Sequence, residues 1–321
     1  MTRVWKDARE GLPHVTGRLR ECTMPGAERI IDLSEEPAWL NVDTARLVIS
    51  RADQARVIIP LADIAALVVS HPQAVMTHAV LAGLAREGGI AVICNEKRMP
   101  AAMLLPLEGH FVQGERFTLQ AQASLPLRKR LWQSLAKAKI RAQGRALSDL
   151  WGDDAGLAQL ALTVRSGDPS NVEAEAARRY WPALFRDPAF RRDRDAGGAN
   201  SLLNYGYAVL RAIIARAVCA AGLHPSLGLH HHNRYDCFCL ADDLMEPFRP
   251  LVDRAAVRYC VENGAPAEVD RAAKQALIGQ LTGRFPTDTG SRQLFDIAGQ
   301  MAGSLAAVFA GKRKDLALPK L

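Results

Sequence analysis

The hydrophobic pattern of this chain changes abruptly near residue 100, and this change limits what the chain can fold into. Before it, short runs rich in β-branched residues alternate with turn residues, as in Ile30–Leu33, Arg46–Ser50, Arg56–Pro60 and Ile64–Val69. After it, strand patterns disappear and apolar residues recur at helical spacing. The sequence therefore predicts an α+β protein, with a small N-terminal β-rich domain followed by a larger all-α C-terminal domain.

The N-terminal part is expected to form a compact antiparallel β unit with one helix. Thr77–Arg86 has helical spacing and is followed by Gly88 and Gly89, a common signal for a helix C-terminus. A short buried strand, Ile90–Cys94, comes next. A strand, a helix and a strand in succession make this part α+β rather than purely β.

These patterns divide the chain into four segments. Residues 1–27 form an irregular extension, and we take Met24 as an alternative native start because ordered patterning begins just after it. The β-rich domain covers residues 28–99, a linker covers residues 100–121, and a helical domain covers residues 122–321.

The helical part contains several segments with apolar residues every three to four positions. They are Leu125–Leu147, Asn171–Phe185, Leu202–Ala221, Leu240–Val252 and Gln293–Phe309. The first also carries a basic stripe of Arg130, Lys137, Arg141 and Arg145. Such a stripe suits contact with a phosphate backbone, and a solvated basic face explains it equally well. The net charge of +7 and the isoelectric point of about 9.2 favour a nucleic-acid partner.

Composition excludes several classes of protein. The chain of 321 residues is 49% hydrophobic, enough for a sizeable core, but it has no run of about 18 apolar residues that would cross a membrane. None of its six cysteines forms a CxxC motif, which excludes a zinc ribbon. We therefore expect a cytoplasmic protein with no membrane segment, whose cysteines are small buried residues in a reducing compartment.

The stretch Leu227–Pro250 has the composition of a metal site. Three consecutive histidines (residues 230–232) precede a polar loop, and the acids Asp242, Asp243 and Glu246 follow on a helical segment. Imidazole and carboxylate groups are common metal ligands. The helical wheel places these acids away from the apolar side, so that Glu246 points to solvent or into a cleft between elements. A solvated acidic face is the alternative interpretation.

Glu173 lies on the apolar stripe of the segment Asn171–Phe185, whereas Glu175 lies on the opposite side near Arg178. A carboxylate on a buried stripe is costly unless a cation or a hydrogen-bond network compensates it. Glu173 is therefore a candidate ligand. The structural alternative is an acid that stabilises the first turn of the helix through its dipole.

Four segments stand in order in the helical part: GDPSNVEAEAARRYW, NYGYAVLRAIIARA, GLHPSLGLHHHN and LADDLMEPFRP. In this order they resemble the CRISPR-associated integrase family, protein one of the CRISPR-associated set, in the form found in type II systems. Upstream segments such as RIIDLSEEPAWL and LWQSLAKAKIRAQ extend the resemblance to roughly residues 29–250.

The resemblance implies a catalytic and metal-binding set of one Glu, one His and one further acid. The family's Glu-x-x-Ala-Ala helix matches Glu173, and the last acid before the Pro-Phe-Arg-Pro run is Glu246. The second histidine of the family's Gly-Leu/Ile-His-His pattern matches His231, with His230 as second choice and His232 as third.

The resemblance also implies the reaction and the partners. The metal would be Mg²⁺ or Mn²⁺, and the 3′-hydroxyl of a captured DNA fragment would attack the CRISPR repeat and insert a new spacer. Implied partners are double-stranded DNA, a second copy in a homodimer, CRISPR-associated protein two, and the type II effector nuclease.

Two other functions remain compatible with the residues alone. One is a non-haem iron oxygenase that uses His230, His232 and an acid, although such folds contain long strands around the metal. The other is a non-catalytic, basic DNA-binding scaffold with a solvated acidic helix.

Overall fold

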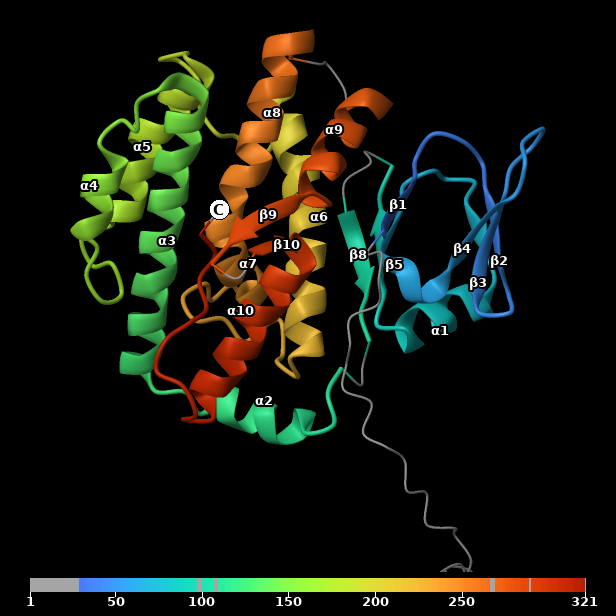
Figure 1. Ribbon diagram of the computed structural model, residues 1–321, viewed down its shortest axis with the longest axis horizontal. Helices are drawn as coiled ribbons and strands as arrows, with labels where there is room; N and C mark the ends of the chain where they lie inside the picture. Colours follow the sequence, from blue (N-terminus) through green and yellow to red (C-terminus); the bar gives the residue numbers. More distant parts are fainter. Residues whose placement is uncertain (1–28, 97–99, 107–108, 266–268, 289, 321) are drawn as a thin grey trace, which may run out of the picture.

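The computed structural model describes residues 29–96, 100–106, 109–265, 269–288 and 290–320, so the predicted extension 1–27 lies outside the described residues. The chain forms a β-rich part on one side and a helical part on the other (Figure 1). The predicted α+β architecture is confirmed.

The β-rich part consists of two four-stranded sheets. The first has the order β1 (Arg29–Leu33), β5 (Ile64–Val69), β7 (Ile90–Cys94) and β8 (Pro100–Leu104). The second has the order β4 (Val57–Pro60), β3 (Arg46–Ser50), β2 (Trp39–Asp43) and β6 (Val75–Met76). Helix α1 (His78–Arg86) packs with them, next to the one-turn helix η1 (Leu61–Asp63).

The expectation of an antiparallel unit is wrong for the first sheet, in which β1, β5 and β7 are parallel. Both faces of this sheet are covered. Leu67 of β5 joins the core shared with the second sheet, whereas Ala66 and Val68 pack toward Ala212 of the helical part. Strands buried on both faces are typical of parallel sheets, and this burial explains the uninterrupted apolar run of β5.

The predicted linker, residues 100–121, is also corrected in part. Residues 100–104 form β8, which pairs antiparallel with β7, and residues 113–121 form a helix, α2 (Gln113–Ala121). Its two prolines and two glycines gave this segment the character of a linker. A strand can nevertheless begin at Pro100, because β8 lies at the edge of the sheet, where a proline need not donate a hydrogen bond.

In the helical part, α6 lies between the other helices and the first sheet (Figure 1). The helices of this part are α3 (Leu125–Trp151), α4 (Leu157–Leu162), α5 (Val172–Phe185), α6 (Ala199–Ala220), α7 (Cys239–Met245), α8 (Arg249–Asn263), α9 (Arg271–Leu281) and α10 (Leu294–Phe309). One turn of 3₁₀ helix, η2 (Glu246–Phe248), joins α7 to α8. A short hairpin of β9 (Arg284–Thr287) and β10 (Gly290–Gln293), which the all-α prediction did not include, precedes α10.

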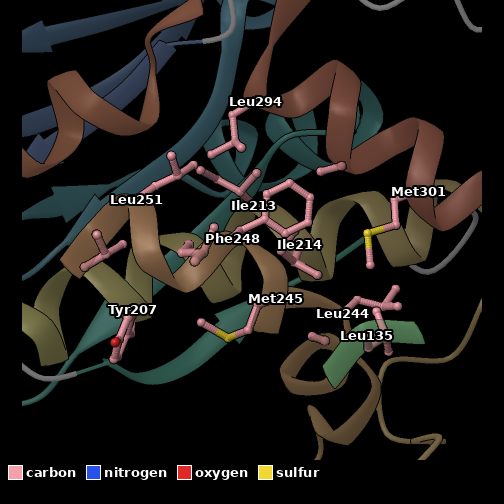
Figure 2. Close-up of a cluster of buried hydrophobic side chains, with 14 of the residues drawn as sticks. Leu135, Tyr207, Ile213, Ile214, Leu244, Met245, Phe248, Leu251, Leu294 and Met301 are labelled. Atoms are coloured by element: carbon pink, nitrogen blue, oxygen red, sulfur yellow. The ribbon is translucent and has the colours of Figure 1, made fainter. Parts of the chain in front are cut away.

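The core of the helical part gathers apolar side chains from α3, α6, α7, α8 and α10. Figure 2 shows Ile213 and Ile214 of α6 among Leu135, Leu244, Phe248, Leu294 and Met301. Within the described residues, α6 is the one helix long and apolar enough to cross a membrane, and 72% of its most apolar window is buried in the protein. The hydrophobicity of α6 therefore reflects its central position in the core.

Two polar contacts join the sheet to α6. The Tyr205 hydroxyl donates to Asp32 of β1 at 2.8 Å, and Arg216 donates to the carbonyl of Gly88 at 2.7 Å. The β-rich part thus packs directly on the central helix that also supports the candidate site.

Candidate metal centre

Helix α5 holds Glu173 in a fixed position because Asp168 caps its first turn. The Asp168 carboxylate accepts hydrogen bonds from the backbone N–H groups of Val172 and Glu173, at 2.9 and 3.0 Å. As predicted, Ala176 and Tyr180 on the same stripe are buried, whereas Glu175 pairs with Arg178 and Arg179 on the other side. Glu173 therefore points from α5 toward the neighbouring helices.

Glu246 begins the 3₁₀ turn between α7 and α8, and its side chain is buried. Asp242, Asp243 and Glu246 were expected to face away from the apolar side, with Glu246 directed to solvent or into a cleft between elements. The expected exposure to solvent is wrong, because these residues are only 6%, 0% and 3% exposed. Both sides of α7 are packed, so the acids are compensated inside the protein rather than by water. Asp242 forms a double hydrogen bond with Arg211, at 2.5 and 2.6 Å.

Lys139 of α3 brings Glu173 and Glu246 together. Its Nζ atom lies 2.5 Å from Oε1 of Glu173 and 2.6 Å from Oε2 of Glu246. Three separate helical segments thus meet at one buried cation. The two carboxylates raise the pKa of Lys139 above its ordinary value, although burial alone would lower it.

Arg249 compensates the other oxygen of Glu246. Its Nε atom donates to Oε1 at 2.9 Å, from one turn further along the chain. Burial would raise the pKa of Glu246, but Arg249 and Lys139 lower it from 4.5 to about 2. Glu246 is therefore ionised across the physiological pH range.

His231 is held by Asp243, not by the two glutamates. Its Nδ1 atom lies 2.6 Å from Oδ1 of Asp243, and this hydrogen bond raises the pKa of His231 despite partial burial. The same carboxylate accepts the backbone N–H groups of Leu229, His230 and His231 at 2.5, 3.0 and 3.2 Å. Because Nδ1 is engaged, Nε2 is the ring nitrogen left for another ligand.

The other two histidines lie differently. The His230 ring stacks on Trp132 with ring centroids 4.1 Å apart, and burial lowers the pKa of His230. His232 is exposed and lines a surface hollow of about 360 Å³ beside His231. These contacts separate the three imidazoles in a way that the sequence alone did not.

The structure therefore brings two of the three predicted ligands to one point and leaves His231 beside them in a separate pair. Among the described residues, no three His, Cys, Asp or Glu side chains form a ready metal-binding group. The donor chemistry nevertheless fits a hard divalent cation, because two carboxylates converge on a single positive charge. Oε2 of Glu246 is buried and makes no hydrogen bond to the described residues, although Lys139 lies close to it.

Sequence reasoning missed Lys139 as a member of the site. A signal was present, since Lys139 follows Trp132 by seven residues and Leu135 by four, which puts it on the buried stripe of α3. Asp243 was noted as an acid of the stretch, but its role depends on how the histidine loop folds back on α7.

The chain is similar to known proteins over most of its length. Residues 32–270 match the family described as "CRISPR associated protein Cas1". A protein of Neisseria meningitidis serogroup C named "CRISPR-associated endonuclease Cas1" is 34% identical over 285 residues, which cover 88% of this chain and 93% of the relative.

Solved structures share the fold. A casposase bound to its integration product has a TM-score of 0.71 and 20% identity, covering 91% of this chain and 93% of the casposase. A chain of a Cas6-RT-Cas1–Cas2 complex has a TM-score of 0.72 and 18% identity, covering 93% of this chain and 36% of that one. At such low identities these structures are evidence of fold alone, but the family match and the Neisseria relative are specific. The chain therefore belongs to the family of the CRISPR-associated protein Cas1.

Proposed function

We propose that this protein is a divalent-metal-dependent DNA endonuclease and integrase that inserts captured DNA fragments as new spacers into a CRISPR array. The observation that carries the proposal is the convergence of Glu173 and Glu246, from separate helices, on one buried cation. The Neisseria relative is named an endonuclease, and the casposase was solved bound to an integration product, so both support the same chemistry.

Glu173, His231 and Glu246 would hold Mg²⁺ or Mn²⁺ as the catalytic and metal-binding set. A bound divalent cation polarises a phosphodiester and stabilises the negative charge that develops on it. Asp243 engages Nδ1 of His231 and so directs Nε2 toward a ligand. Arg249 holds Glu246 ionised and oriented. The attacking group would be the 3′-hydroxyl of the captured fragment, so no side chain needs to become covalently attached.

A basic hollow next to Glu246 supports contact with DNA. It encloses about 450 Å³ and is lined by four arginines, namely Arg192, Arg194, Arg211 and Arg249. Tyr207, Tyr235 and Phe238 line it as well. Arginine and aromatic side chains together suit the phosphates and bases of a nucleic-acid strand. On α3, Arg130, Arg141 and Arg145 are exposed and offer a second basic surface.

The second sheet presents an apolar face that supports a homodimer. Trp39, Ile58 and Val75 are 57%, 52% and 43% exposed, and Trp39 pairs directly with Val75 across β2 and β6. Exposed apolar surface of this kind favours association, and a second copy is the partner we propose.

The fold shared with a chain of a Cas6-RT-Cas1–Cas2 complex supports CRISPR-associated protein two as a further partner, and the resemblance to type II systems adds their effector nuclease. Cytoplasmic location follows from the DNA substrate.

A non-catalytic scaffold is less well supported, because the acids it would place on a solvated helix are buried in ion pairs.

The proposed function is tested by an integration assay with the protein, CRISPR-associated protein two, a DNA fragment and a repeat-bearing plasmid. Integration should require Mg²⁺ or Mn²⁺ and should fall at least about 100-fold in Glu173→Ala. Glu175→Ala, two residues away on the surface of the same helix, is the matched control. Wild-type integration by Glu173→Ala would exclude the proposed site.

A further inference from the structure

Lys139 occupies the position between the two glutamates that a metal ion shared by them would need. Its Nζ atom lies within 2.6 Å of an oxygen of each carboxylate, and divalent cations bind carboxylate oxygens at about 2.0–2.6 Å. An ammonium group and a metal ion cannot both fill this space. Lys139 comes from α3, whereas its two partners come from α5 and η2, so it can move without either carboxylate moving.

The charges around Lys139 explain why the protein needs a cation there. Glu173 and Glu246 would otherwise face each other in a largely buried position, where like charges repel strongly. Arg249 contacts only Oε1 of Glu246, which leaves Oε2 and Glu173 to Lys139. Of the other charged groups nearby, His231 pairs with Asp243, and Asp253 accepts hydrogen bonds from the Tyr180 and Tyr207 hydroxyls.

Adding a divalent cation to this arrangement changes the balance. Lys139 and Arg249 already offset the two glutamates, so a metal ion entering beside Lys139 would place excess positive charge in a buried cluster. The Lys139 side chain is 14% exposed, more than the 5% of Glu246, and a flexible four-carbon stem allows it to swing toward solvent.

We infer that Lys139 is an internal counter-ion that holds Glu173 and Glu246 together in the metal-free protein and is displaced when a divalent cation binds. This inference rests on the proposed function in one respect, since it takes these glutamates as metal ligands. Lys139 is thus a positioning residue that competes with the metal and lowers the apparent affinity of the site.

Two quantities are measured for wild type and for each variant. One is the Mn²⁺ affinity, by calorimetry, and the other is the midpoint temperature of thermal unfolding, in EDTA and in Mn²⁺. Lys139→Met removes the charge and keeps most of the length of the side chain. The Lys139→Met protein should unfold at a lower temperature than wild type in EDTA and should bind Mn²⁺ at least about fivefold more tightly. Its midpoint should also rise more on addition of Mn²⁺ than that of wild type. Lys139→Arg keeps the charge and should retain weak binding. Lys137→Met, a half-buried lysine on the same helix, is the matched control.

A merely structural lysine would give a different result. Equal destabilisation of Lys139→Met with and without Mn²⁺, or an unchanged or weaker Mn²⁺ affinity, overturns the inference while leaving the proposed function intact. If wild type binds no Mn²⁺, the proposed metal dependence fails and this inference fails with it.

A second measurement uses wild-type protein and does not depend on the variants folding. Lysine acetylation followed by mass spectrometry should modify Lys139 faster in Mn²⁺ than in EDTA, with Lys137 as internal reference. If saturating Mn²⁺ did not increase the acetylation rate of Lys139, the proposed displacement of Lys139 by the metal would be wrong.

Discussion

The Tyr180 hydroxyl donates a 2.8 Å hydrogen bond to Oδ2 of Asp253, and each of these residues lies seven positions after one of the paired glutamates. Seven residues are about two helical turns, so they fall on nearly the same helix face as Glu173 and Glu246. The helical segments that carry the glutamates are thus joined twice, first through Lys139 and two turns later through Tyr180 and Asp253. Tyr207 donates a second hydrogen bond to Asp253. These hydrogen bonds to Asp253 form an inner layer beneath the Lys139 contacts, and this inner layer fixes the separation of the Glu173 and Glu246 carboxylates.

Removing the Tyr180 hydroxyl should loosen this inner layer. Tyr180→Phe leaves Oδ2 of Asp253 buried without a donor, and the free energy of unfolding should fall by about 1–2 kcal/mol in urea titrations. Tyr235→Phe is the matched control, because the Tyr235 side chain is 84% exposed, and its stability should equal that of wild type. An unchanged stability of Tyr180→Phe would argue against a fixed spacing.

Asp253 should give the protein a distinctive pH dependence. Burial raises the pKa of Asp253 from 3.8 to about 6, although Tyr207 and Tyr180 donate to it. Between these values the folded protein holds a proton that the unfolded chain releases. The resulting stabilisation is complete below pH 3.8 and is lost as the pH rises through about 6.

The measurement is urea unfolding at several pH values from 4 to 7. Asp253→Asn, which carries no titrating proton, should show a flatter stability profile than wild type over this range. Asp195→Asn, at an exposed aspartate, should keep the wild-type slope. Identical slopes for wild type and Asp253→Asn would contradict the assignment.

The three histidines should separate cleanly on substitution. His231→Ala should weaken Mn²⁺ binding at least about tenfold in calorimetric titrations. His230→Ala should keep the metal affinity but lose about 0.5–1.5 kcal/mol of stability, because it removes the stack on Trp132. His232→Ala should resemble wild type in both measurements. A larger loss of affinity in His230→Ala than in His231→Ala would reverse the assignment.

The apolar face of the second sheet predicts a variant that separates the proposed dimer. Ile58→Glu places a charge on this face, on the edge strand β4, and should shift sedimentation from the mass of a dimer to that of a monomer. Leu162→Glu, at an equally exposed leucine of α4, should leave the mass unchanged. If the Ile58→Glu protein remained dimeric, the dimer interface would not be this face of the second sheet.

Much of the helical part could be predicted because its amphipathic period is strong. The same period placed Glu173 on the inner stripe and Glu175 on the opposite side, and the structure agrees with that placement. The period also puts Lys139 on the buried stripe of α3, but it does not make Lys139 a member of the site, since a lysine on an apolar stripe usually reaches past it to solvent. The strands β2 and β6 were missed because β2 carries Asn41 and Asp43 and β6 has only two residues. Strand direction was missed because short apolar runs do not encode their partners.

The loop before α7 has a consequence for the run of histidines. One Asp243 carboxylate accepts three successive backbone amides, and a side-chain carbon at Gly228 would overlap the His231 carbonyl and lie 3.0 Å from Asp243. The loop is therefore locked in a single register. The three histidines therefore cannot replace one another. If one were deleted, its neighbour would not move into its position, because the hydrogen bonds to Asp243 prevent the backbone from shifting by one residue.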